Sequence, residues 1–138
     1  MNERVIVIDS DSAQLKGVRE ELQKLLSTAG FRGKALDDLL VALGEATSNS
    51  IRHAYANEKG HEVRITLEDQ PDKIVLRIRD FGKKINLSQV KPPELPPTKP
   101  SGLGIYFMKT MVDDLQYNTA HAQGNEVILT KFKPTTKE

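Results

Sequence analysis

The chain of 138 residues contains no cysteine and no tryptophan, and aromatic residues make up only 5% of it. The lack of cysteine excludes disulfides, cysteine-ligated metals and thiol catalysis, and it favours a cytoplasmic protein. No apolar run is long enough to cross a bilayer, and the first residues lack the apolar stretch of a signal peptide. We therefore expect no membrane contact.

An excess of charge of one sign is also missing. Twenty basic residues nearly balance nineteen acidic ones, for a formal net charge of +1. Bulk electrostatics gives no reason to expect nucleic acid as a partner. With 38% hydrophobic and 28% charged residues the composition is that of a globular protein, and we expect one domain over residues 1–138 with a polar tail at 134–138.

Local patterns predict an α+β fold. Runs that are β-branched, or that alternate apolar and polar residues, predict strands. These runs are residues 4–9, 63–69, 74–80, 115–120 and 126–132. Turn residues at Gln70-Pro71-Asp72 and at Gly124-Asn125 predict hairpins. Because hairpins pair antiparallel, we expect a two-layer sandwich with a mostly antiparallel sheet and helices on one face.

Apolar residues at steps of three and four predict a helix over about 12–29 and a second over about 34–56. Ser10 or Ser12 can cap the first helix, and Gly30 can end it in a left-handed conformation. The stripe of the second helix is Leu36, Leu39, Leu40 and Leu43. A third helix is expected from Gly102, with Ile105, Met108 and Val112 as its apolar face.

Residues 83–101 have no regular pattern and contain five of the seven prolines. A structureless stretch of this length is unusual inside a compact domain. It is either a functional lid or a disordered insertion.

Glu45 and Asn49 lie four residues apart on the second helix, with Arg52 nearly one turn further on. One interpretation is a solvated helix face, which is the commoner case for a Glu/Asn pair. The other is chemical, because an amide oxygen can bind Mg²⁺ and a carboxylate one turn away can orient a nucleophile or accept its proton. His53 follows on the same segment, where a lone histidine more often packs or caps than catalyses.

Ile74, Leu76 and Ile78 alternate along a strand and are expected to face the core, and Asp80 is the next residue on that same side. An ionised carboxylate on the apolar side is costly unless a donor reaches it. Either Asp80 caps the strand end through backbone N–H groups, or it awaits a donor on a ligand, such as the amino group of adenine. Gly82 would let a flat ring approach the backbone. The triplet Asp80-Phe81-Gly82 is not evidence for a eukaryotic-type kinase, because the other motifs of that fold are missing.

Gly102-Leu103-Gly104 opens the third helix directly after the proline-rich stretch. Free N–H groups at a helix start favour an anion, and two glycines allow a phosphate to approach the backbone. Glycines at a helix start usually serve only the geometry of the turn and bind no ligand. Lysines in the preceding stretch could reach phosphate oxygens, although flexible lysines are more often only solvated.

Taken together, these segments resemble a known family. E-x-x-x-N-x-x-x-H-A at residues 45–54, D-x-G at 80–82 and G-L-G at 102–104 occur in order, with a lid between the last two. This resembles the GHKL ATP-binding fold, and the form EATSNSIRHAY is most similar to the anti-sigma factor serine/threonine kinases. The resemblance extends from Val5 to Phe132.

The resemblance implies ATP and Mg²⁺ as cofactors, Glu45 as the group that activates the acceptor hydroxyl, Asn49 as the Mg²⁺ ligand and Asp80 as the adenine ligand. The residues expected at the nucleotide are Asn49, Arg52, His53, Asp80, Gly82, Gly102, Leu103 and Gly104. One departure is Lys84, which stands where the family often has a second glycine.

By this resemblance the protein is an ATP-dependent protein kinase that phosphorylates an anti-anti-sigma (STAS) protein, sequesters a sigma factor and forms a homodimer. An alternative is a nucleotide-binding switch module with little kinase activity. A second alternative is an isolated histidine-kinase-like ATPase domain, which is disfavoured because the sequence has no helix pair with a phosphoacceptor histidine ahead of the domain.

Overall fold

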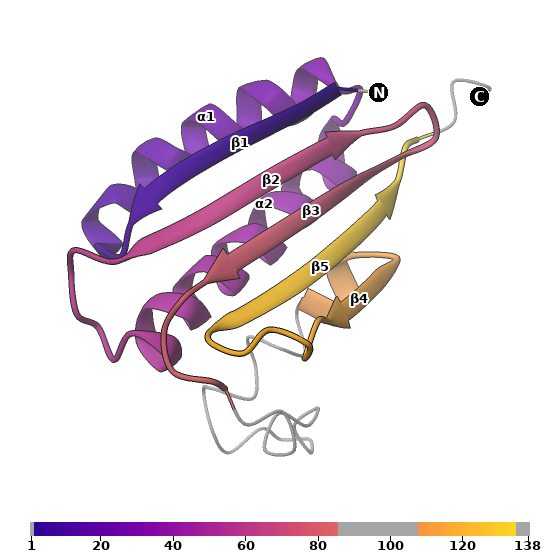
Figure 1. Cartoon of the computed structure of the whole chain (residues 1–138). Coiled ribbons are helices and arrows are strands. Elements are labelled where there is room, and N and C mark those ends of the chain that lie inside the picture. The colour runs from indigo at the N-terminus through magenta and orange to yellow at the C-terminus, as the bar shows by residue number, and fades with distance from the viewer. Residues whose placement is uncertain (1, 86–107, 135–138) are drawn as a thin grey trace, which may run out of the picture.

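All helices of the described chain lie on one face of a five-stranded antiparallel sheet (Figure 1). The protein is represented by a computed structural model that describes residues 2–85 and 108–134. The strands are β1 (Asn2–Asp9), β2 (Glu62–Asp69), β3 (Lys73–Asp80), β4 (Asp114–Tyr117) and β5 (Asn125–Phe132). The helical elements are η1 (Ser12–Gln14), α1 (Leu15–Thr28), α2 (Gly33–Asn49) and η2 (Ser50–Ala54).

The sheet has the order β1-β2-β3-β5-β4, and each of its neighbouring pairs is antiparallel. The chain returns from β4 to insert β5 between β3 and β4, so β3 is the middle strand and β5 lies beside it. Asp80 at the end of β3 is therefore opposite Asn125 at the start of β5. The α+β prediction is confirmed, and this register sets up the candidate site.

The core lies between the sheet and the helices. Alternating residues of β2, β3 and β5 face it, with Leu67, Leu76 and Leu129 aligned across the three strands. Burying each such side chain stabilises the fold by about 1.5–3 kcal/mol. The predicted leucine stripe of α2 is buried throughout. Helix α1 buries Leu22 and Leu26 against the core.

Three local predictions have different outcomes. Gly30 has a φ of +108° and ends α1 as expected. Ser10 does not cap that helix, because its hydroxyl donates to the Glu58 carbonyl at 2.5 Å and accepts from the His61 N–H. The side chain of Asp11 caps η1 instead, accepting from the N–H of Ala13.

The second helix is not α-helical to its predicted end. After Asn49 it widens into the π-helical turn η2, and the Tyr55 N–H donates five residues back to the Ser50 carbonyl. Such turns often mark functional sites. Ala56 and Asn57 then leave the helix with positive φ.

Several predictions fall on residues 86–107 or 135–138 and lie outside the described residues. They concern most of the lid, the Gly102-Leu103-Gly104 helix start, Ile105 and the end of the tail. Residues 108–111 are helical, and Met108 and Val112 are buried as predicted. None of the helices in the described ranges has both the length and the apolar character that a membrane-crossing helix requires.

Candidate functional site

Asp80 is the most unusual polar residue of the core, with none of its surface exposed. Its Oδ1 atom accepts from three donors: the N–H of Gly82 (3.2 Å), the N–H of Asn125 (3.1 Å) and Nδ2 of Asn125 (3.0 Å). Its Oδ2 atom is also buried and finds no donor among the described residues. One oxygen of Asp80 therefore caps the strand end, as the first interpretation predicts, while the other has no donor among the described residues.

Gly82 packs directly against the end of η2. A Cβ atom at this position would lie 2.7 Å from the carbonyl carbon of Ala54 and 2.7 Å from Cδ1 of Tyr55, and closer still to the Ala54 carbonyl oxygen. That oxygen accepts a 2.8 Å hydrogen bond from the N–H of Lys83. The absence of a side chain thus allows the segment after β3 to dock on the helix end.

Tyr55 fixes the same segment from the other side. Its hydroxyl donates to the Glu62 carbonyl at 2.5 Å and accepts from the N–H of Phe81 at 2.7 Å. Burial raises the pKa of the Tyr55 phenol, which keeps the hydroxyl protonated and able to donate. The ring stacks on His61 with centroids 4.8 Å apart.

Glu45 and Asn49 lie one turn apart on α2, but their exposure differs from that of a solvated face. Asn49 is only 6% exposed, and Glu45 is half-buried. Oδ1 of Asn49 accepts a 3.2 Å hydrogen bond from Nη2 of Arg52. The Asn49 side chain is therefore buried and bonded to Arg52 rather than solvated.

The Mg²⁺ expectation can be compared with the available ligands. In the described part of the chain, no three His, Asp or Glu side chains form a group able to hold a metal. Mg²⁺ commonly takes one or two protein ligands and fills its remaining positions with phosphate oxygens and water. A single amide ligand, Asn49, fits that mode of binding and does not fit a metal held by the protein alone.

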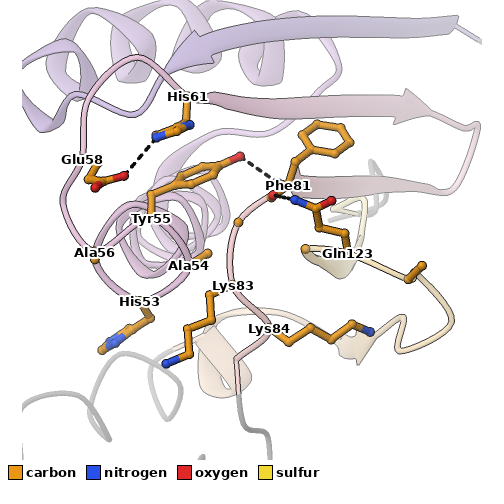
Figure 2. Close-up of a pocket in the computed structure, with 13 residues that line it drawn as sticks. His53, Ala54, Tyr55, Ala56, Glu58, His61, Phe81, Lys83, Lys84 and Gln123 are labelled. Atoms are coloured by element: carbon orange, nitrogen blue, oxygen red, sulfur yellow. Dashed lines mark hydrogen bonds and ion pairs between the residues drawn. The ribbon is translucent and has the colours of Figure 1, made fainter.

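A cleft of about 630 Å³ opens beside this site, between the end of η2 and the two loops that follow β3 and precede β5. Figure 2 shows the Tyr55–His61 stack and Phe81 on one side, and His53, Lys83 and Lys84 together on another. Of the predicted site residues, His53 and Gly82 line this cleft, whereas Glu45, Asn49 and Asp80 do not. Among the described residues the cleft therefore adjoins the Asp80 carboxylate without including it.

Lys84 stands where the resembled family often has a second glycine, and it has no left-handed backbone conformation. Its φ is not among the positive values, and its Nζ donates to the Thr119 carbonyl at 3.3 Å. No left-handed conformation is required at this position, so glycine is not required either.

Three residues of the site were missed as functional candidates. Asn125 was predicted only as a turn residue, yet its side chain joins Asp80 to the following loop. Gly124, with a φ of +78°, brings that turn against the Asp80 carbonyl. Tyr55 has no sequence signal beyond its place after the histidine, whereas the Gly-Asn dipeptide could have suggested a tight approach.

A sheet covered by helices on one face, a buried carboxylate at the end of β3 and a Glu/Asn pair on α2 form the arrangement that the sequence resemblance led us to expect. The chain belongs to the histidine kinase-like ATPase domain family, which matches residues 8–131.

More particularly, the chain is 30% identical over 124 residues to the serine-protein kinase RsbW of Bacillus subtilis, covering 83% of this chain and 76% of that protein. The proteins of the same name from Listeria innocua and Listeria monocytogenes are each 29% identical over 123 residues, with the same coverage. The resemblance to the anti-sigma factor kinases of the GHKL superfamily is thus confirmed, and the chain is a kinase or ATPase of that group.

Proposed function

We propose that this protein is an ATP-dependent serine/threonine protein kinase that acts as an anti-sigma regulator. Its substrate would be an anti-anti-sigma STAS protein, and its second partner a sigma factor. The observation that carries the nucleotide site is the buried Oδ2 of Asp80, which lacks a donor among the described residues and suits the amino group of adenine.

The roles of the chain's own groups follow from their positions. Asp80 would bind the base, with Gly82 allowing the ring to approach the backbone. Asn49 would hold Mg²⁺ once Arg52 turns away from its amide oxygen. The bound ion would supply neutralisation of phosphate charge.

Glu45, one turn before Asn49, would orient the acceptor hydroxyl and take its proton. Arg52 and His53 would face the phosphates from η2, and Gly102, Leu103 and Gly104 would contact them from the lid side. Catalysis of this kind depends mainly on positioning and on electrostatic stabilisation of the transferred phosphoryl group.

We further propose one domain over residues 1–138 with a lid at about 83–101, a homodimeric assembly and a cytoplasmic location, without nucleic acid or membrane as a direct partner. The near-neutral charge and the lack of cysteine support the last points. The names of the RsbW relatives support serine as the acceptor.

Phosphoryl transfer tests the proposal directly. The protein is incubated with labelled ATP and a STAS protein encoded beside it, and transfer is compared with that of Glu45→Ala. We expect the variant to bind ATP normally and to lose transfer by about a hundredfold or more, because general-base catalysis contributes about 10²–10⁴-fold.

Transfer at the native rate by Glu45→Ala would contradict the base assignment. Tight ATP binding by the wild-type protein without any transfer would favour the alternative, a switch module that binds nucleotide and partners but has little kinase activity.

A further inference from the structure

Asn125, the first residue of β5, uses every polar atom of its side chain. Nδ2 donates to Oδ1 of Asp80 at 3.0 Å and to the Lys83 carbonyl at 2.9 Å, and Oδ1 accepts from the N–H of Ile85 at 2.8 Å. Its backbone N–H adds a 3.1 Å bond to the same oxygen of Asp80. One side chain therefore connects the buried carboxylate to the loop that leaves β3.

These bonds distinguish the two oxygens of Asp80. Oδ1 has three donors, two of them from Asn125, while Oδ2 has none among residues 2–85 and 108–134. Rotating the carboxylate by half a turn about χ2 would place the other oxygen under the same donors, and smaller rotations would break their geometry. The orientation is thus fixed, and Oδ2 is held as an acceptor with one defined direction.

Only an amide side chain can both donate to Asp80 and Lys83 and accept from Ile85 at this position. An aspartate of similar shape could accept from Ile85 but could donate neither to Asp80 nor to Lys83, and an apolar residue could do none of these. The same bonds tie the backbone of Lys83 and of Ile85 to the start of β5.

We propose that Asn125 is a positioning residue that determines base specificity, by holding Asp80 so that Oδ2 accepts from a 6-amino group and repels a 6-oxo group. This rests on the proposed function, in which Asp80 binds the base. Adenine presents an N–H donor at position 6, whereas hypoxanthine presents a carbonyl oxygen. A carboxylate free to turn would discriminate less sharply between the two.

The test measures the dissociation constants of ATP and of inosine triphosphate (ITP) by calorimetry, for the full chain and for Asn125→Ala. A second variant, Asn125→Leu, keeps a side chain of similar size without its hydrogen bonds, and it serves if the alanine variant does not fold. The matched control is Asn118→Ala, which removes another asparagine side chain next to the same strand. Its Nδ2 contacts Glu126 at 3.0 Å rather than Asp80. Thermal unfolding of each variant checks the fold.

We expect the wild-type protein to prefer ATP, and Asn125→Ala to reduce the ratio of ITP to ATP dissociation constants by about tenfold, the effect of one hydrogen bond to a charged group. The dissociation constant of ITP for Asn125→Ala should differ from the wild-type value by less than threefold. The control Asn118→Ala should keep the wild-type ratio of ITP to ATP dissociation constants. A merely structural role would weaken both nucleotides equally.

Two results overturn the inference in different ways. An unchanged ratio, or equal weakening of both nucleotides, in a folded Asn125 variant shows that Asn125 does not set specificity, while the proposed function stands. A wild-type protein that binds neither nucleotide, or does not distinguish them, removes the proposed function itself and the inference with it.

Discussion

Adding one methyl group at Gly82 should destabilise the protein markedly. In Gly82→Ala the new Cβ would lie 2.7 Å from the carbonyl carbon of Ala54 and 2.7 Å from Cδ1 of Tyr55, whereas ordinary contacts lie near 3.4–4 Å. Neither obstacle can yield easily, because one is backbone and the other belongs to a ring held by two hydrogen bonds. Something must move by most of an ångström.

The cost can be worked from these contacts. Overpacking of this kind costs about 1–3 kcal/mol. Moving the loop also lengthens the 2.8 Å hydrogen bond from Lys83 to Ala54, which contributes about 1 kcal/mol. The sum is about 2–4 kcal/mol, which corresponds to a Tm lower by roughly 5–15 °C for a domain of this size.

Thermal unfolding followed by circular dichroism or calorimetry measures the effect. The matched control is Gly17→Ala, because Gly17 lies in α1 with nothing within 4 Å of an added Cβ. Alanine is favoured over glycine in a helix, so this variant should be more stable by up to about 1 kcal/mol. Gly82→Ala that unfolds within a degree of the wild type would refute the close packing described for this loop.

Three further predictions concern charged groups. Asp80→Asn should weaken ATP binding tenfold or more, because the amide NH₂ can take the place of Oδ2 and cannot accept from the amino group of adenine. Unchanged affinity by calorimetry would defeat the adenine assignment. Arg52→Gln should weaken ATP binding about tenfold, because a charged group proposed to face the phosphates is lost; unchanged affinity by calorimetry would contradict that role. Glu126 is partly buried, which alone would raise its pKa, but hydrogen bonds from His121 and Asn118 lower its pKa overall. A carboxyl whose pKa is lowered in the folded state stabilises the fold above its unfolded-state pKa, and this stabilisation is lost as the pH falls through the folded-state pKa. Below about pH 4.5, Glu126→Gln should therefore lose less of its free energy of unfolding than the wild type does. Urea unfolding at a series of pH values would measure the difference.

The strands and the helix faces could be predicted because their signals are local. Alternation along residues 63–69 and 74–80 gave β2 and β3 to within one residue, since each side chain's face depends only on its own strand. The phase of that alternation also placed Asp80 among the core residues, which the structure confirms.

The missed features depend on partners far along the chain. Ser10 suited a helix cap by residue type, but its hydroxyl bonds to residues about fifty positions away. The π-helical turn forms where Ala54 meets Lys83, and the side chain of Asn125 meets a carboxylate on another strand. Such contacts follow from sheet order, which no local pattern specifies.

The widened turn at Ser50–Ala54 holds one more residue than a regular α-helix would use for the same rise. Deleting a single residue there would restore ordinary α-helical pairing and remove the wide turn, so the helix end that accepts the N–H of Lys83 would be rebuilt. The carbonyl of Ala54 and the ring of Tyr55, which support the loop after β3, both belong to that helix end. In this region the number of residues, and not only their identity, is under constraint, and protein engineering that shortens this helix should avoid it.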